Sequence, residues 1–568
     1  MATLDTSPLR STHRPDFPGT LNRRRLLQAT AASGLLVAVG GPATRSALAA
    51  PARQDAPTQT LVAAFADGPN GTDIAFHAAL RSIDIYRACA LTPMTFNSVA
   101  VGDVFVPDFS TVVPYAAESW EVNPEWTSIT INLRKGILSP FGNELTADDV
   151  LYSYQRIEAT KGHNWPFMQN ALNIKTIDNI TKDDTYVYTI RSDAPNALLE
   201  IINAHGVFTI LDSVEFKKHA TDDDPWSVDW ASSNIAGHGA WKLTEYTPGQ
   251  SWTLERNENY FDPASLTGNV AKVVNRVVPE SANRVALLQA GSVDMAMDLE
   301  SAELESLQNA PGVRVDSLPG NHLQWLGFTF GSPDAPQLDD VNVRQAIGYA
   351  LPFDELLARP YLNQAQQMKS TVAPSYAGYD VTSTVWNRAR DVDKAKELLA
   401  GTEWASGFSL PLHYNLNAAG QEETAIIVKS ALAEVGIEVN LVQVQSADYF
   451  NLAFGGAGFP GLFIYKDMAG TPDVNFGTHL WLKTGHCCAP GKYSNTDIDA
   501  LYAEAQSSPD DFEKRVDLQR QIDDIALNQD PMGVPLQALG FHGSSRENVG
   551  GWWWQSLNEL VWNKAWKK

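Results

Sequence analysis

Hydrophobic and polar positions follow two different patterns along the chain, and the change falls near residue 340. Before this point, short runs that are apolar or alternate with a period of two predict β-strands. These predicted strands cover residues 61–65, 128–133 and 186–190. After it, apolar residues recur at three- and four-residue spacing, which predicts amphipathic helices. The predicted helices cover residues 340–350, 391–400, 421–435 and 510–528.

Start and stop signals add detail to this pattern. Thr146 can cap a helix over residues 146–157, and Asp149, three positions on, completes a capping box. Gly436 ends the predicted helix before it, and residues 437–441 alternate as a strand. A helix followed by a glycine and a strand is typical of an α/β lobe. The sequence therefore predicts an α/β fold.

The N-terminal segment has the pattern of an export signal. Arg23 and Arg24 stand before an apolar stretch, residues 26–39, and Ala47 to Ala49 form a small-x-small cleavage pattern. The apolar stretch is shorter than the roughly 20 residues that span a bilayer. The segment resembles a twin-arginine signal peptide covering residues 1–49. We expect a mature chain that begins near Ala50 and is soluble in the periplasm or another extracytoplasmic space.

Length and charge restrict the classes of partner. About 520 mature residues exceed what one hydrophobic core serves, so two or more lobes are expected. The whole chain has a formal charge of −24, and removing the signal, whose net charge is +4, leaves −28. Such an acidic surface argues against nucleic acid and anionic membranes as partners, because both need clustered Lys and Arg.

Motifs for catalysis or metal binding are missing from the sequence. It has no phosphate-binding loop, Gly-x-Ser-x-Gly elbow, His-Glu-x-x-His pair or Cys-x-x-Cys. We therefore expect no enzyme and no cofactor. His479 and His486 stand close to Cys487 and Cys488, but their spacing fits no common metal site, and we expect loop histidines and core thiols. Cys89 is either a free buried thiol or bridged to one of these two cysteines.

Several sequence blocks follow one another across almost all of the mature chain. They are 117–122 (Ala-Glu-Ser-Trp-Glu-Val), 133–136 (Leu-Arg-Lys-Gly), 145–150 (Leu-Thr-Ala-Asp-Asp-Val), 239–246 (Gly-Ala-Trp-Lys-Leu-Thr-Glu-Tyr), 254–261 (Leu-Glu-Arg-Asn-Glu-Asn-Tyr-Phe), 284–294 (Arg-Val-Ala-Leu-Leu-Gln-Ala-Gly-Ser-Val-Asp), 343–347 (Val-Arg-Gln-Ala-Ile), 394–399 (Lys-Ala-Lys-Glu-Leu-Leu) and 493–495 (Tyr-Ser-Asn). In this order they resemble the peptide/nickel/opine family (family 5) of solute-binding proteins that serve ABC importers.

The resemblance implies an α/β, two-lobed clamp of the periplasmic-binding-protein type (type II-like), with an additional domain and a discontinuous first lobe. The implied parts are residues 50–100, 230–318 and 536–568 for the first lobe, 101–229 for the additional domain, and 319–535 for the second lobe. The two chain crossings, near Leu318 and Pro535, would act as the hinge.

The resemblance also implies where ligand is chosen. In family members that bind peptides, a strand and loop of the second lobe present an Asp to the ligand's free amine, usually in the run Asp-Tyr-x-Asp/Glu-Pro. Here Asp467 stands at the matching position, after Tyr465 and Lys466, and the loop that follows is altered and longer. Lys466 departs from the pattern. It either neutralises Asp467, which weakens the case for a ligand amine, or forms a solvated pair with it.

Aromatic residues supply further candidates for ligand contact, because aromatic faces suit sugar rings and apolar side chains. Among the 16 tryptophans, Trp325 lies just past the expected hinge and Trp481 lies in the loop after Asp467. The run 552–554, three consecutive tryptophans, is expected to pack within the first lobe.

These features predict a substrate-binding protein that captures a small molecule by hinge closure and delivers it to the membrane permease subunits of an ABC importer. The ligand is expected to be a peptide or peptide-like solute, with an oligosaccharide, an opine-like conjugate or a metal chelate as alternatives. We expect a monomer. The rival interpretations are a secreted hydrolase, such as a glycosidase with two carboxylates, and an interaction protein on the same scaffold.

Overall fold

The described part of the chain, in a computed structural model, is residues 57–568 without 78, 163, 380–387, 417, 455–457, 469 and 487. The predicted signal peptide and its cleavage site lie outside the described residues. Within them, no helix combines the length and the apolar composition needed to cross a membrane.

The central element of the fold is a mixed 11-stranded sheet. Its strand order is β15-β14-β16-β12-β17-β11-β1-β10-β9-β8, and β13 pairs with β17. The strands are β1 Gln59–Phe65, β8 Trp241–Thr247, β9 Ser251–Arg256, β10 Val270–Val277, β11 Met295–Ala296, β12 Val313–Phe328, β13 Gln366–Gln367, β14 Phe408–Asn415, β15 Ile437–Val444, β16 Leu462–Met468 and β17 Gly533–Arg546. Parallel pairs, such as β1 with β10 and β14 with β15, show that the sheet is of the α/β kind.

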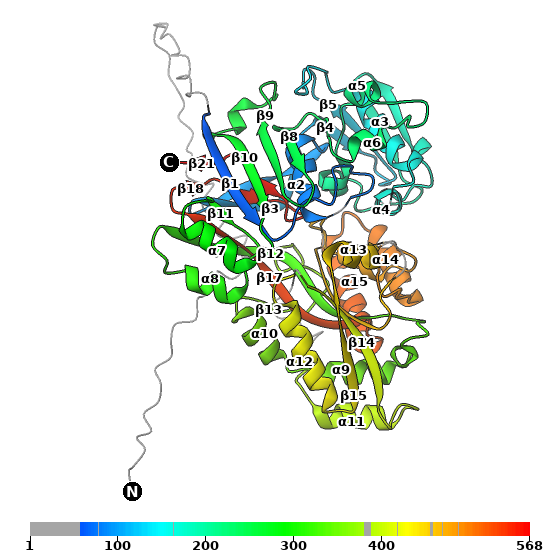
Figure 1. Cartoon of the computed structure of the whole chain (residues 1–568). Coiled ribbons are helices and arrows are strands. Elements are labelled where there is room, and N and C mark those ends of the chain that lie inside the picture. Colours follow the sequence, from blue (N-terminus) through cyan, green and yellow to red (C-terminus); the bar gives the residue numbers. More distant parts are fainter. Residues whose placement is uncertain are drawn as a thin grey trace, which may run out of the picture. The chain divides into compact units, whose positions relative to one another are not determined.

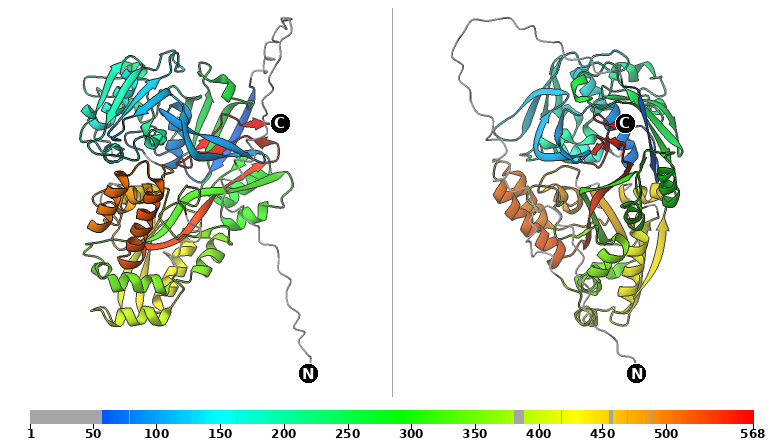
Figure 2. Two further views of the ribbon diagram at one scale, coloured as in Figure 1. Left: turned by 180° about the vertical axis from the view of Figure 1, so that it is seen from behind. Right: turned by 90° about the vertical axis from the view of Figure 1, so that its left-hand side faces the viewer.

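Two long antiparallel strands, β12 and β17, join two α/β lobes (Figures 1 and 2). Their pairing runs from Val313 opposite Arg546 to Gly327 opposite Gly533. The register shifts between Leu318 and His322, so the ladder is interrupted near its middle. Strands β1 and β8–β11 lie at one end of this pair and β14–β16 at the other.

Helices cover both parts of the large sheet. Those packed around β1 and β8–β11 are α2 Leu80–Cys89, α7 Ser281–Gln289 and α8 Ser301–Leu307. The other lobe contains α9 Val341–Ala350, α10 Phe353–Tyr361, α11 Val392–Ala400, α12 Gln421–Ala433, α13 Ser446–Phe454, α14 Thr496–Gln506 and α15 Phe512–Asp524, with π-helical turns at Thr478–Leu482 and Ile525–Gln529. The four helices predicted after residue 340 are thus confirmed as α9, α11, α12 and α15.

A separate four-stranded sheet, β4-β5-β7-β6, forms an additional layer of structure (Figure 1). Its elements are β4 Ala117–Val122, β5 Ser128–Leu133, β6 Ile180–Asp184, β7 Val187–Arg191, α3 Ala147–Ala159, α4 Asn164–Leu172, α5 Ser213–Lys218 and α6 Val228–Ala231. The predicted capping box is present at the start of α3: Asp148 N–H donates to Thr146 Oγ1 at 3.3 Å, and Thr146 N–H donates to Asp149 Oδ2 at 2.8 Å.

Shorter elements complete the fold. They are the hairpin β2 Met94–Val101 with β3 Val104–Pro114, the C-terminal pairs β18 Val549–Gly550 with β21 Trp566–Lys567 and β19 Trp553–Trp554 with β20 Leu560–Val561, and 3₁₀ turns at Ile177–Asn179, Ile201–Ala204, Gly206–Phe208, Pro263–Ser265 and Pro336–Asp339.

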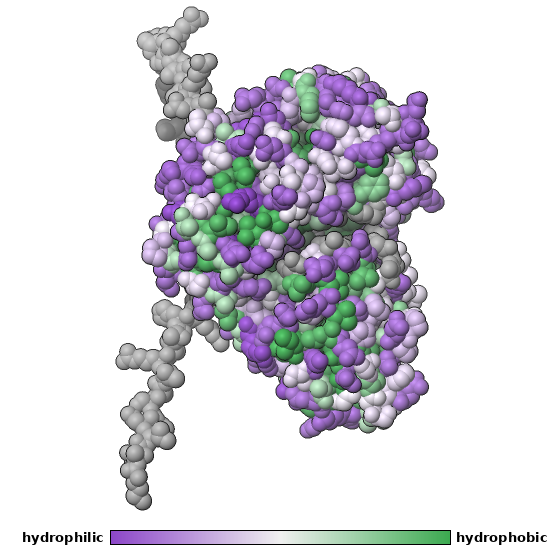
Figure 3. All heavy atoms as spheres, viewed as in Figure 1, coloured by the Kyte–Doolittle hydropathy of each residue, from purple (hydrophilic) through white to green (hydrophobic). Residues whose placement is uncertain are grey.

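The buried residues bear out two expectations about packing. All three tryptophans of the run 552–554 are buried. Cys89 is a buried free thiol, so it forms no disulfide, and burial raises its pKa to about 12. Cys487 lies outside the described residues. Hydrophilic residues cover most of the face seen in Figure 3, with smaller hydrophobic patches between them.

Candidate functional site

Strand β16 carries the predicted ligand-choosing residues next to the long strand β12. Tyr465 pairs with Trp325 and Asp467 with Leu323 across the two strands. Because successive side chains of a strand point to opposite faces, Tyr465 and Asp467 share one face and Lys466 points to the other. The strand therefore divides the predicted site into two.

The Asp467 carboxylate is held by three hydrogen bonds. The hydroxyl of Tyr465 donates to its Oδ2 at 2.6 Å, and the indole N–H of Trp481 donates to the same oxygen at 3.0 Å. The backbone N–H of Met468 donates to Oδ1 at 2.8 Å. Burial raises the pKa of Asp467, whereas these three bonds stabilise the charged form and oppose that rise. The result is a fixed carboxylate with strong acceptor capacity.

Lys466 faces a different set of charges. Burial lowers its pKa, and the carboxylates of Asp298 and Asp67 in the first lobe act in the opposite direction. Burial also raises the pKa of Asp67, and the charge of Asp298 adds to this. The expected pairing of Lys466 with Asp467, in solvent or as neutralisation, is wrong, because the pleat of β16 separates their side chains.

The two predicted tryptophans lie close to Asp467 and Tyr465. Trp481 bonds to Asp467, and Trp325 pairs with Tyr465 across the two strands. Trp325 and Trp481 contact each other edge to face, with ring centroids 5.9 Å apart, and both are buried. With Tyr465 and Phe463 they line a small cavity of about 20 Å³, which has room for about one water molecule at most. The structure thus unites Tyr465, Asp467, Trp325 and Trp481, and leaves Lys466 on the other side of the strand.

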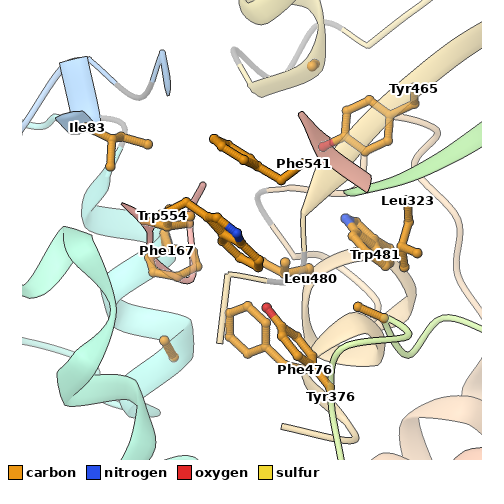
Figure 4. Packing of buried hydrophobic residues seen from close by; sticks show 14 of the residues in the cluster. Ile83, Phe167, Leu323, Tyr376, Tyr465, Phe476, Leu480, Trp481, Phe541 and Trp554 are labelled. Atoms are coloured by element: carbon orange, nitrogen blue, oxygen red, sulfur yellow. The ribbon is translucent and has the colours of Figure 1, made fainter. Parts of the chain in front are cut away.

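Aromatic side chains fill the space where several segments meet (Figure 4). Phe167 of α4 lies 6.4 Å from Phe476, and Tyr376 lies 5.2 Å from Phe109, measured between ring centroids. Trp554 lies 5.8 Å from Phe109, measured between ring centroids. Residues far apart in sequence therefore meet in one buried cluster, which also includes Trp325, Tyr465 and Trp481.

A charged cluster on α2 was missed by the sequence reasoning. Arg81, Asp84 and Arg87 are buried and spaced by three, so they share a helix face. Arg81 pairs with Asp84 at 2.6 Å, and Arg87 lies 3.3 Å from Glu559 of the C-terminal segment. Arg81 also approaches Asp298, at 4.0 Å, and so adjoins the charges that face Lys466. The three-residue spacing of charges was the signal that could have revealed this face.

His479 and His486 do contact each other, as a buried pair. Their Nε2 atoms are 3.2 Å apart, and Nδ1 of His479 is 2.8 Å from the hydroxyl of Tyr502. Within the described residues, no group of three or more His, Cys, Asp or Glu side chains is arranged to hold a metal ion. Both imidazole rings are buried in the core of the protein.

His205, which packs on the same aromatic cluster, provides a pH-dependent prediction. Its ring lies 4.8 Å from Phe167 and 6.1 Å from Phe476, and its Nδ1 accepts the backbone N–H of Val207 at 3.2 Å. Burial, with a smaller effect of the charge of Arg87, lowers its pKa to about 3. The unfolded chain binds a proton near pH 6.5, so stability falls as the pH drops from about 6.5 towards 3.

We expect His205→Asn, which keeps an acceptor for Val207, to reduce this acid sensitivity. Between pH 7 and pH 5 the variant should lose about 2 kcal/mol less unfolding free energy than the wild type. Urea unfolding at both pH values measures the difference. Equal losses in the two proteins would show that His205 is not the titrating group.

The arrangement of two α/β lobes around a pair of long connecting strands, with an added domain, is that of a two-lobed periplasmic binding protein. The sequence agrees: the chain matches the family described as bacterial extracellular solute-binding proteins, family 5 (middle), over residues 111–486. The protein belongs to this family of solute-binding proteins, which confirms the resemblance read from its sequence blocks.

Individual relatives and solved structures are similar over most of the chain. The heme-binding protein A of Haemophilus influenzae is 25% identical over 448 residues, 76% of this chain and 80% of that protein. The dipeptide-binding protein of Escherichia coli is 24% identical over 466 residues, 77% and 83% of the two chains. A periplasmic binding protein from Helicobacter pylori in complex with the peptide STSA has a TM-score of 0.77 at 22% identity, covering 89% of this chain and 98% of that one.

Proposed function

We propose that this protein captures a peptide or peptide-like solute between its lobes by hinge closure and delivers it to the permease subunits of an ABC importer. The observation that carries the proposal is the fixed Asp467 carboxylate, oriented by Tyr465 and Trp481 beside the connecting strand β12. A carboxylate held in this way suits a ligand ammonium or hydroxyl group in a desolvated cleft. The dipeptide-binding relatives support the ligand class.

We assign the first lobe to residues 50–100, 230–318 and 536–568, the additional domain to 101–229 and the second lobe to 319–535. The register shift between Leu318 and His322 of β12 supports a hinge there. Lys466 then belongs to the second lobe and faces Asp67 and Asp298 of the first. These opposite charges would favour the closed state, so ligand choice and closure would use the two faces of one strand.

Clamp closure predicts a smaller molecule in the presence of ligand. Native mass spectrometry of the exported protein, searching for a co-purifying solute, identifies the ligand to use. With this solute at saturation, small-angle scattering should show a smaller radius of gyration, and the melting temperature should rise because ligand binds the native state. An unchanged scattering profile at saturation would count against the hinge.

The proposal includes export and a monomeric, non-enzymatic protein. Replacing Arg23 and Arg24 by Lys should stop export if the signal is of the twin-arginine type, and the exported wild-type chain should begin at or near Ala50. Cell fractionation and N-terminal sequencing measure both. Normal export of the double variant would exclude the twin-arginine assignment alone. Turnover assays on saccharides and peptides should show no product.

A further inference from the structure

A cavity of about 260 Å³ lies in the first lobe and the adjoining part of the additional domain, away from β16. It is lined by α2, the β2–β3 hairpin, the start of β8, residues 260–265 and the C-terminal segment, and no described residue of 319–535 contributes to it. Its volume corresponds to roughly nine water molecules at about 30 Å³ each. We call it the C-terminal pocket. Six aromatic residues line it: Phe96, Tyr115, Trp241, Tyr260, Trp553 and Trp562.

One side of the C-terminal pocket carries an ammonium group without a carboxylate partner among the described residues. Lys564 Nζ donates to Ser98 Oγ at 2.9 Å and lies over the rings of Phe105, at 4.3 Å, and Trp553, at 5.7 Å. Burial lowers its pKa, and no carboxylate opposes this effect. The other cation of the lining, Arg87, differs because it is neutralised by Glu559.

The lining of the pocket also includes a carboxylate. Asp262 lies near the phenols of Tyr115 and Tyr260. Burial raises the pKa of both phenols, and the charge of Asp262 adds to this effect. The two phenols bond to each other, Tyr260 donating to Tyr115 at 3.3 Å. Among the described residues, no Lys or Arg forms an ion pair with Asp262. The pocket thus offers one positive and one negative group on different elements of its wall.

Two buried polar atoms of the lining also have no hydrogen-bond partner among the described residues. They are the indole Nε1 of Trp553 and the amide Oε1 of Gln555, from side chains that are 7% and 2% exposed. A buried donor or acceptor without a partner is destabilising, so a ligand that supplies partners gains affinity. One atom is a donor and the other an acceptor.

We propose that the C-terminal pocket is a second small-molecule site, which binds a free amino acid with an aromatic or large apolar side chain. Its carboxylate meets Lys564 and the indole N–H of Trp553. Its ammonium meets Asp262, with Gln555 Oε1 as a further acceptor. The side chain packs on the indole and phenol rings of the wall. This site is separate from the Asp467 site and does not rest on hinge closure.

The test uses L-phenylalanine as the probe, measured by calorimetry on the full mature chain. N-acetylphenylalanine lacks the ammonium and phenylalaninamide lacks the carboxylate, so each should bind at least about tenfold more weakly than phenylalanine. These two compounds test the roles of the ligand's ammonium and carboxylate groups in the unaltered protein. The test therefore does not depend on whether the variants fold. Equal binding of all three compounds would overturn the proposal.

Variants then locate the site. Lys564→Met and Asp262→Asn should each weaken phenylalanine binding about tenfold or more. The matched controls are Lys568→Met, at an exposed lysine over Trp566, and Glu258→Gln, at an exposed carboxylate. Both should bind like the wild type. Asp467→Ala should also retain binding. Absence of binding to the wild type, or a loss confined to Asp467→Ala, would overturn the assignment.

Discussion

Replacing Arg156 by Met should lower the unfolding free energy by about 3–5 kcal/mol, the largest single-residue effect on stability that we expect. The guanidinium of Arg156 binds Asp73 through two parallel hydrogen bonds, each 2.6 Å long, and its Nε donates to the carbonyl of Trp226 at 2.8 Å. The exposed fractions of the two side chains are 0% and 2%. Removing the cation leaves a buried carboxylate without its partner.

The ion pair also joins parts of the fold that are far apart in sequence. Asp73 precedes α2, whereas Arg156 lies on α3 of the separate sheet layer. We expect Asp73→Asn to have a similar cost, and the double variant Arg156→Met with Asp73→Leu to cost less than the sum, because neither charge then remains unpaired. Denaturant unfolding measures all three.

A matched control is available on the surface. Lys182 pairs with Asp148 at 2.8 Å, and these side chains are 34% and 60% exposed. Solvent screens such a pair, so Lys182→Met should cost less than about 1 kcal/mol. If Arg156→Met and Lys182→Met had equal effects, the buried pair would not link the two layers as described.

Asp467→Ala should weaken ligand binding about tenfold to a hundredfold, equivalent to roughly 1.5–3 kcal/mol. The reason is the loss of a charge-assisted hydrogen bond to the ligand in apolar surroundings. Calorimetry with the solute identified by mass spectrometry gives the affinity. Wild-type affinity in this variant would exclude Asp467 from the site and leave the clamp unaffected.

Two companion variants separate ligand contact from structural support. Asp467→Asn retains an acceptor for Tyr465 and Trp481 but removes the charge, so it should keep the melting temperature and still lose affinity for a cationic group. Tyr465→Phe keeps the carboxylate and removes one of its donors. It should reduce affinity less than Asp467→Ala. The opposite order would mean that Tyr465, rather than Asp467, contacts the solute.

Much of the fold could be predicted because its signals are local. The period-two pattern of 128–133 and the capping box at Thr146 depend on neighbours within a few residues, and both are present as β5 and α3. The helix over 510–528 was predicted as continuous. In the structure α15 ends at Asp524 and passes into a π-helical turn. The sequence did not reveal this change, because the spacing of apolar residues alone does not distinguish an α-helical from a π-helical turn.

The candidate site could be predicted only in part. The sequence pointed to Tyr465, Asp467 and Trp481, and these three are joined by hydrogen bonds. It also suggested a pair between Lys466 and Asp467, since adjacent opposite charges look like partners in sequence. The structure shows no such pair, because the side chains of successive residues in β16 point to opposite faces of the sheet.

By itself, then, the sequence determined the α/β class, most helices and the family. Periodicity, helix caps and motif blocks each depend only on residues that are close together in the sequence. Only the tertiary structure decided which charges meet. Arg87 pairs with Glu559 and Lys466 faces Asp67, over separations of several hundred residues. Such contacts depend on how strands far apart in sequence are ordered in one sheet, and no local pattern specifies that order.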